Sequence, residues 1–284
     1  MKTVHIALIV PDPRLHIFQG FNEILQTFQW GLNQLGFQTS FAVNGFSSTA
    51  VNIVFGAQML PLETLRALPA NTIVYNLEQA AGLDPAEMRD SMKYCGEHFQ
   101  IWDYSEYNIP TWEKLNPARP PAHVPVGYAP ILTRIEKPQD QEIDVLFYGG
   151  VAGPRLQVFH DLCVNLIKAV YVHGLYGDSR DRMIANSKIV LNINQYPEFS
   201  VFEVPRVSYL LANSKAVVSD YSPNSKIEAD MKGAVDFCPT DRVAAECLRL
   251  LADDAAIIEL ENRGFEIMRQ RDIRGILRNA VTAL

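Results

Sequence analysis

Short apolar runs alternate along this chain with longer segments in which apolar residues recur every three or four positions. The short runs are typical of strands buried on both faces, and the longer segments are typical of helices that pack one side against a sheet. Strands that alternate with helices predict parallel sheets with crossover connections. In the first part of the chain, the predicted strands are 4–10, 37–43, 51–55, 72–75 and 99–102. The helices predicted between them are 21–35, 59–68 and 85–94.

The same pattern restarts at residue 143, which predicts a second lobe of the same kind. Its predicted strands are 143–148, 169–173, 189–193, 216–219 and 235–237. Its predicted helices are 154–166, 180–186, 202–212 and 241–251. The segment 116–138 between the lobes is irregular and rich in proline, as a stiff connector would be. We therefore expect an α/β fold of two Rossmann-like lobes with an interlobe cleft.

The expected domain boundaries follow from these patterns. An N-terminal Rossmann-like lobe is predicted over 1–130, and a C-terminal lobe over 140–254. The tail 255–284 is helical in pattern and charged on one face. It is long enough to return to the first lobe and pack there as C-terminal helices.

Composition and charge narrow the possible functions. The 284 residues are 48% hydrophobic and 20% charged, which is enough for two buried cores. A net charge of -7 gives an average field that repels nucleic acid, so we expect no nucleic-acid partner. No stretch approaches the roughly 18 apolar residues of a transmembrane segment, and 1–10 is interpreted as a core strand rather than a signal peptide. The four cysteines lack CxxC spacing, which suits a reducing cytoplasm.

The segment 202–220 carries the most informative chemistry. Glu203 and Arg206 stand at the start of a predicted buried helix, and Asp220 ends the strand that follows. Ligands of open α/β sheets bind at the carboxyl ends of the strands. The two oxygens of Glu203 match a vicinal diol, although a glutamate there can also simply complement the helix dipole. Arg206 is expected either at a phosphate or in an ion pair, and Asp220 either at the ligand or capping the next turn.

A glycine turn follows the first strand of the second lobe. Gly149 and Gly150 would let backbone N–H groups approach an anion at a helix N-terminus, where Arg155 would add a bidentate charge. These residues predict a phosphate site. The alternative is a tight turn with a solvated arginine.

Two residues of the first lobe are candidates for a general base. His16 follows the first strand, and a neutral imidazole can accept a proton. Glu78 follows the strand 72–75 between Asn76 and a further polar side chain, and it is the competing candidate. The residues after the next strand are expected to line the same cleft: Asp103, Tyr104, Ser105 and Asn108.

Several longer segments resemble a known family. In the second lobe they are VLFYGG at 145–150 with Arg155, LYGDSRDRMIANSKIVLNI at 175–193 and VFEVPRVSYLLANSKAVVSD at 201–220. This lobe resembles the donor-binding half of GT-B glycosyltransferases, and among them the bacterial CgeB/YkvP-like group. IVYNLEQ at 73–79 and IWDYSEYNI at 101–109 are similar to segments of the same proteins.

The resemblance implies transfer of a sugar from a nucleotide-sugar donor to an acceptor hydroxyl. Glu203 would bind the ribose hydroxyls, and the glycine turn with Arg155 would bind the diphosphate. The acceptor would be a glycan, a lipid-linked molecule or a protein. No metal and no other cofactor are expected, since the chain has no DxD triplet and no His/Cys cluster at metal spacing.

The chain also departs from the family pattern. Where many retaining enzymes carry an acid upstream of Glu203, the sequence reads NQYPE at 194–198, with Glu198 out of register. The usual small-Cys-Gly sequence is replaced by LAN at 211–213. A non-catalytic nucleotide-sugar binding protein, or a GT-B-like epimerase or phosphorylase, would share the fold. A Rossmann dehydrogenase or methyltransferase is disfavoured because no GxGxxG follows the first strand of either lobe.

Overall fold

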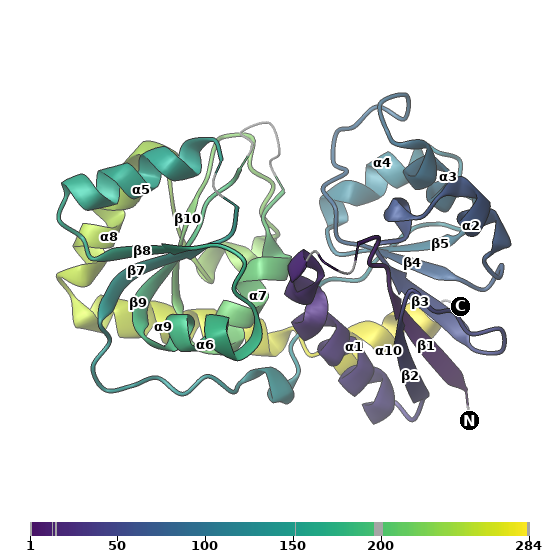
Figure 1. Ribbon diagram of the computed structural model, residues 1–284, viewed down its shortest axis with the longest axis horizontal. Helices are drawn as coiled ribbons and strands as arrows, with labels where there is room; N and C mark the ends of the chain where they lie inside the picture. Colours follow the sequence, from purple (N-terminus) through teal and green to yellow (C-terminus); the bar gives the residue numbers. More distant parts are fainter. Residues whose placement is uncertain (1, 13, 15, 151, 196–200, 283–284) are drawn as a thin grey trace. The chain divides into compact units, whose positions relative to one another are not determined.

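The computed structural model describes residues 2–12, 14, 16–150, 152–195 and 201–282. The chain forms two compact units, Met1–Gly127 with Asp272–Leu284, and Tyr128–Arg271. Each unit contains one parallel sheet with helices on both faces (Figure 1). The predicted α/β class with two parallel-sheet lobes is confirmed. Within the described part of the chain, the helices are all too short or too polar to cross a bilayer.

The first unit is built on a sheet with the strand order β2-β1-β3-β4-β5-β6. The strands are β1 (Thr3–Leu8), β2 (Gln38–Val43), β3 (Val51–Phe55), β4 (Ile73–Asn76), β5 (Gln100–Asp103) and β6 (Ala122–His123). Helices α1 (Asn22–Gln34) and α10 (Ile273–Thr282) cover one face, and the other face carries α2 (Leu62–Ala67), α3 (Asp90–His98) and α4 (Ile109–Glu113) (Figure 1).

Aromatic packing and one glycine explain how the first unit is held together. The rings of Phe28 and Tyr75 have centroids 4.7 Å apart, and Phe55 completes the cluster under α1. A Cβ atom at Gly31 would lie 2.9 Å from Cδ1 of Leu277, so α1 and α10 are in close contact at this glycine. The C-terminal helix α10 is thus part of the first core.

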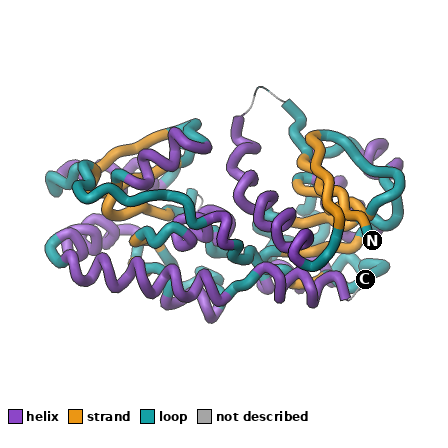
Figure 2. Tube along the Cα trace, turned by 90° about the horizontal axis from the view of Figure 1, so that it is seen from below, coloured by secondary structure: helices purple, strands orange, loops and turns teal. Residues whose placement is uncertain are grey.

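The second unit has the strand order β11-β10-β9-β7-β8. The strands are β7 (Ile143–Tyr148), β8 (Ala169–Val172), β9 (Ser187–Asn192), β10 (Ala216–Asp220) and β11 (Asp236–Cys238). Helices α5 (Pro154–Val164) and α8 (Val243–Leu251) cover one face, and α6 (Gly177–Ala185) and α7 (Val204–Ala212) cover the other (Figure 1). In Figure 2 the strands of each unit lie together, with the helices outside them.

The strand order locates the switch point of the second sheet. From β7 the chain crosses to β8 on one side and then to β9 on the other. In open α/β sheets, ligands bind where the order reverses, outside the carboxyl ends of the two central strands. Here those ends lead into the loops that begin at Gly149 and at Ile193.

Two expectations about domain boundaries differ from the structure. Helix α9 (Asp254–Gln270) packs against α7 and β10 in the second unit, so only α10 of the predicted tail lies in the first unit. The reason is the buried face of α9, where a Cβ atom at Gly264 would lie 2.8 Å from the Ala234 carbonyl oxygen. The predicted connector also contains β6, which pairs with β5.

The largest difference in a helix boundary is at α3. The helix predicted over 85–94 begins at Asp90 and continues to His98. The carboxylate of Asp84 accepts a hydrogen bond from the N–H of Ala86 at 2.7 Å, which stabilises a turn rather than a helix at that place.

Candidate functional site

The turn after β7 depends on glycine. Gly149 has φ +147°, where an L side chain is strained, and its carbonyl oxygen accepts hydrogen bonds from Tyr171 and His173. Gly153 has φ +57°, and a Cβ atom there would lie 2.5 Å from the Gln195 carbonyl oxygen. The turn after β7 and the loop after β9 are therefore packed backbone to backbone at the switch point.

Arg155 joins these two loops. Its side chain is 2% exposed. Its Nε donates to the Ile193 carbonyl at 2.7 Å, and its Nη1 donates to the Gly150 carbonyl at 3.0 Å and to Gln195 Oε1 at 3.2 Å. The alternative of a solvated arginine is wrong. Burial lowers the pKa of Arg155 and the neighbouring cation Arg206 lowers it further, while carboxylates nearby act in the opposite direction.

Glu203 and Arg206 form an adjacent pair at the start of α7. Glu203 is the residue before the first turn, and its side chain is 25% exposed. Its Oε2 lies 3.0 Å from Arg206 Nη1, and its Oε1 lies 3.8 Å from Arg155 Nη2. The 3.0 Å contact is an ion pair whose geometry is not that of a hydrogen bond. Among the described residues, neither Glu203 Oε2 nor Arg206 Nη1 has a hydrogen-bond partner, although both atoms are buried. Arg206 Nη2 lies 3.7 Å from the position of a Cβ atom at Gly149.

Asp220 ties three strand ends together. Its Oδ1 accepts from the Asn194 N–H at 2.8 Å, after β9, and its Oδ2 accepts from Thr240 Oγ1 at 3.2 Å, after β11. Burial raises the pKa of this carboxyl, and the charge of Glu203 raises it further. With 6% exposure, Asp220 holds neighbouring loops in place.

The six second-lobe candidates thus lie at the same carboxyl edge of one sheet. They are Gly149, Gly150, Arg155, Glu203, Arg206 and Asp220. Two guanidinium groups of like charge stand side by side, with two carboxylates next to them. Such an arrangement can bind an anion and a hydroxyl-rich group together. The ligand roles of the individual residues stay predictions.

The residues of the first unit proposed as a base lie in separate segments of the chain. His16 is exposed in a short 3-10 helix (His16–Phe21), and its Nδ1 is 3.2 Å from Gln19 Nε2. Glu78 is exposed after β4, where its Oε1 accepts from Gln58 Nε2 at 3.2 Å. Neither role is tested by these contacts. Glu198, the out-of-register acid, lies outside the described residues.

One expectation about the first unit is wrong. Asp103, Tyr104, Ser105 and Asn108 do not line a surface, because their exposed fractions are 0%, 2%, 1% and 0%. Burial raises the pKa of Asp103 to about 6, although the hydrogen bonds that it accepts act in the opposite direction. These residues form an internal polar network.

Three residues of the site were missed in the sequence. Tyr171 and His173 bind the Gly149 carbonyl, and Gln195 contacts Arg155. A signal was present, since Tyr171 and His173 belong to the last three residues of the predicted strand 169–173 and Gln195 follows the predicted strand 189–193. The same rule identified Asp220.

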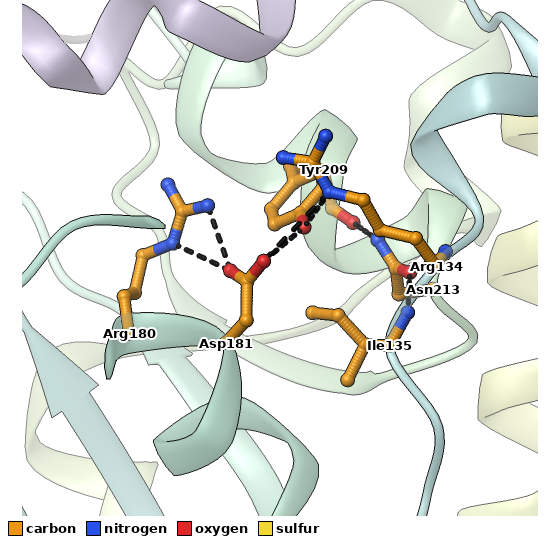
Figure 3. A network of polar contacts seen from close by, with 6 residues as sticks. All are labelled: Arg134, Ile135, Arg180, Asp181, Tyr209 and Asn213. Carbon is orange, nitrogen blue, oxygen red and sulfur yellow. Dashed lines mark hydrogen bonds and ion pairs between the residues drawn. The ribbon is translucent and has the colours of Figure 1, made fainter. Parts of the chain in front are cut away.

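A second polar network fixes the helix that carries Glu203. Figure 3 shows Tyr209 of α7 donating to Asp181 Oδ2 at 2.7 Å, with Arg180 Nη2 donating to the other oxygen at 2.8 Å. Arg134 Nε donates to the Tyr209 hydroxyl at 2.9 Å, and Asn213 Oδ1 accepts from the Arg134 N–H at 2.8 Å. Burial and the bond to Asp181 raise the pKa of Tyr209, so it stays a donor. Helix α7 is therefore anchored to α6 and to the segment around Arg134.

Sequence comparisons find relatives without a described activity. No protein-family model matches the chain. An uncharacterized protein of Acanthamoeba polyphaga mimivirus, L140, is 28% identical over 190 residues, which are 64% of this chain and 60% of the relative. A second mimivirus protein, L138, is 24% identical over 171 residues, which are 58% of this chain and 19% of the relative. The chain spans less than two thirds of the length of either relative.

Solved structures match nearly the whole chain. AviGT4, a glycosyltransferase involved in avilamycin A biosynthesis, has a TM-score of 0.61 at 14% identity, over 98% of this chain and 96% of that chain. Anabaena HepE in complex with UDP and glucose has a TM-score of 0.64 at 10% identity, over 100% of both chains. Sucrose-phosphate synthase of Thermosynechococcus elongatus has a TM-score of 0.61 at 10% identity, over 98% of this chain and 99% of that chain. With its two parallel-sheet units, the chain has the fold of the GT-B glycosyltransferases.

Proposed function

We propose that this protein is a glycosyltransferase that moves a sugar from a nucleotide-sugar donor to an acceptor hydroxyl. One observation carries the proposal. The Glu203 carboxylate and the Arg206 guanidinium stand next to the Gly149 turn, and each has a buried polar atom without a hydrogen-bond partner in the described structure. The fold supports it, because HepE, which shares that fold, is known in complex with UDP-glucose.

The donor is proposed to bind at the switch point of the second sheet. Glu203 accepts hydrogen bonds from the two ribose hydroxyls. The N–H groups of Gly149 and Gly150, together with Arg206, bind the diphosphate. Arg155 and Asp220 hold the loops around the donor, since their contacts are with those loops.

The proposed reaction is a displacement at the anomeric carbon. The acceptor oxygen forms the new glycosidic bond while the bond to the diphosphate oxygen breaks, and the hydroxyl proton passes to Glu78 or His16. Negative charge that grows on the leaving diphosphate is stabilised by Arg206 and the glycine N–H groups. In this proposal no metal ion and no further cofactor take part. The acceptor is a glycan, a lipid-linked molecule or a protein.

Location and subgroup are also part of the proposal. The described cysteines are all free, with Cys95, Cys238 and Cys247 buried, which suits a reducing cytoplasm. The segments quoted above favour a member of the CgeB/YkvP-like group. A GT-B-like epimerase or phosphorylase would use the same fold, and transfer of labelled sugar to an acceptor separates these reactions.

A non-catalytic nucleotide-sugar binding protein is the second candidate. It is favoured by the loop after β9, where Asn194 and Gln195 stand in the region in which many retaining enzymes carry an acid. Such a protein would bind the donor without releasing the nucleoside diphosphate. The two candidates therefore differ in turnover, not in binding.

The test is a melting-temperature screen with UDP, GDP, dTDP and CMP sugars. One nucleotide class should raise the melting temperature of the wild-type protein, and Glu203→Ala should abolish that shift. The matched control is Glu246→Ala. Glu246 stands in the first turn of α8, forms an ion pair with the arginine three residues later and is 21% exposed. The control should keep the full shift. A shift that survives in Glu203→Ala, or none with any nucleotide sugar, rejects the donor site.

A further inference from the structure

A fully buried carboxylate ends strand β5 of the first unit. Asp103 is 0% exposed and accepts four hydrogen bonds. The donors are Asn76 Nδ2 at 2.7 Å, Asn108 Nδ2 at 2.8 Å, Trp112 Nε1 at 2.7 Å and the Ser105 N–H at 2.9 Å. An ionised carboxylate has no proton to donate, so each neighbour must turn an N–H toward it.

This requirement fixes the orientation of two side-chain amides. Because the nitrogen of Asn76 faces Asp103, its Oδ1 faces away and accepts from the Glu78 N–H at 3.2 Å. In the same way, Asn108 Oδ1 accepts from the N–H groups of Ala80 at 3.0 Å and Ala81 at 2.8 Å. Both amide nitrogens also donate to the Glu78 carbonyl oxygen, at 2.8 and 3.1 Å. Asp103 thereby determines the backbone conformation of 78–81.

The side chain on this rigid backbone is exposed. Glu78 stands at the carboxyl edge of the sheet, and its carboxylate accepts from Gln58 Nε2 at 3.2 Å. The backbone of Gln58 is held as well, since Ser91 Oγ donates to its carbonyl oxygen. Burying a carboxylate has a desolvation cost, which the four hydrogen bonds to Asp103 offset. A fully hydrogen-bonded network of this kind also holds the neighbouring backbone in one geometry. The segment 78–81 thus begins with an exposed carboxylate, and the partly exposed amide of Gln58 lies next to it.

We propose that Asp103 is a positioning residue that, through Asn76 and Asn108, holds Glu78 in place beside Gln58, so that the two side chains bind hydroxyl groups of a carbohydrate acceptor. The proposal rests on the glycosyltransferase function above. A hydroxyl group both donates and accepts hydrogen bonds. The Glu78 carboxylate would therefore accept a hydrogen bond from the acceptor hydroxyl, and the Gln58 amide would donate one to the oxygen of that hydroxyl. In this proposal Glu78 also accepts the proton of the attacking hydroxyl. The acceptor class is a polyhydroxylated molecule, not an apolar one.

The test compares two buried asparagines of the same unit. Asn108→Ala removes the side chain that binds Glu78, Ala80 and Ala81. The control is Asn52→Ala, because Asn52 is also 0% exposed and also holds a loop, with Oδ1 accepting from the Ser47 N–H at 2.8 Å. Asn52 lies in β3, and the loop that it holds precedes that strand. Both variants should lose melting temperature to a similar extent.

The readouts separate positioning from stability. The donor is the nucleotide sugar with the largest melting shift, and methyl glucoside is the added acceptor. Release of the donor's nucleotide, with the sugar passing to water or to methyl glucoside, should fall at least about tenfold in Asn108→Ala and stay within about twofold in Asn52→Ala. A tenfold loss corresponds to only about 1.4 kcal/mol. Hydrogen exchange at the amides of Glu78, Ala80 and Ala81 should speed up in Asn108→Ala alone. Donor binding should be unchanged in both.

Each contrary result has a distinct meaning. If Asn108→Ala releases nucleoside diphosphate as fast as Asn52→Ala although its amides exchange faster, the geometry of 78–81 is not used and the positioning role is rejected. Unchanged exchange in Asn108→Ala rejects it too. A wild-type protein that binds the donor and never cleaves it rejects the role while leaving the donor site intact. Failure to bind any nucleotide sugar refutes the proposed function itself.

Discussion

The Nε atom of Arg155 donates a hydrogen bond to the carbonyl oxygen of Ile193 at 2.7 Å. The donor comes from helix α5 and the acceptor from the loop after β9. One side chain therefore joins the two segments on either side of the switch point of the second sheet. Because the guanidinium also donates to the Gly150 carbonyl at 3.0 Å, its planar fork holds two backbone segments in one geometry. Lysine, with a single ammonium group, does not reproduce that fork.

Replacing Arg155 should therefore affect both stability and donor binding. Arg155→Met leaves the carbonyls of Gly150 and Ile193 without their partner, and we expect a loss of about 1–3 kcal/mol in the free energy of unfolding, measured by urea denaturation. The control Arg249→Met removes an arginine that is 54% exposed and should cost under about 1 kcal/mol. Equal urea midpoints for the two variants would contradict the clamp.

Gly153 provides a second test of the same contact. In Gly153→Ala, the new Cβ atom would lie 2.5 Å from the Gln195 carbonyl oxygen at φ +57°, so the two loops must separate. The control Gly174→Ala has φ +72° with no atom within 4 Å of the new Cβ, so it carries only the backbone strain of about 1 kcal/mol. Gly153→Ala should lose more unfolding free energy than Gly174→Ala and should also bind more weakly the nucleotide sugar that gives the wild-type protein its largest melting shift. Equal losses would show that the loops yield without cost.

The strands were predictable because parallel strands covered on both faces are predominantly apolar. The predicted 51–55 and 143–148 coincide with β3 and β7. Strand β6 was missed because Ala122–His123 is short and lies among prolines, and only its pairing with Trp102 and Asp103 makes it a strand. Hydrophobic patterning showed that α9 buries one face, but not against which sheet it packs.

The sequence predicted contacts between site residues that are close in the chain, but not the contacts that these residues make with distant segments. Glu203 and Arg206 are one turn apart, so the sequence alone brings them together. The burial of Arg155 depends on which carbonyl groups of a distant loop turn toward it, and periodicity does not contain that information. The same holds for Asp103, whose donors Asn76 and Asn108 lie at the end of β4 and in the short 3-10 helix after β5.

Leu166 should be a site where substitution stabilises the protein. It follows α5 with φ +58°, its side chain is 93% exposed, and the Ile167 N–H closes the helix end on the Leu162 carbonyl at 3.1 Å. This left-handed position favours glycine, so Leu166→Gly should raise the free energy of unfolding by about 0.5–1 kcal/mol. Leu166→Ala keeps a Cβ atom and should change stability little. A loss of stability in Leu166→Gly, measured by thermal and urea unfolding, would mean that the exposed leucine makes a contact in solution.

Lys215 should make stability depend on pH in the alkaline range. Its side chain is 1% exposed, its Nζ donates to the Ser187 carbonyl, and burial lowers its pKa from 10.5 to about 8, partly offset by the charge of Glu261. Between pH 8 and 10.5 Lys215 is therefore protonated in the unfolded chain and largely neutral in the folded protein. Because the unfolded chain then binds more protons, the contribution of Lys215 makes the free energy of unfolding rise with pH, by at most about 1.4 kcal/mol per pH unit. Lys215→Met should remove this rise. The urea midpoint of this variant should therefore gain less from pH 7.5 to pH 10 than that of the wild-type protein. The control is Lys188→Met, at a lysine that is 36% exposed, which should keep the wild-type gain. If Lys215→Met follows the wild-type pH dependence, Lys215 is charged in the folded protein throughout this range.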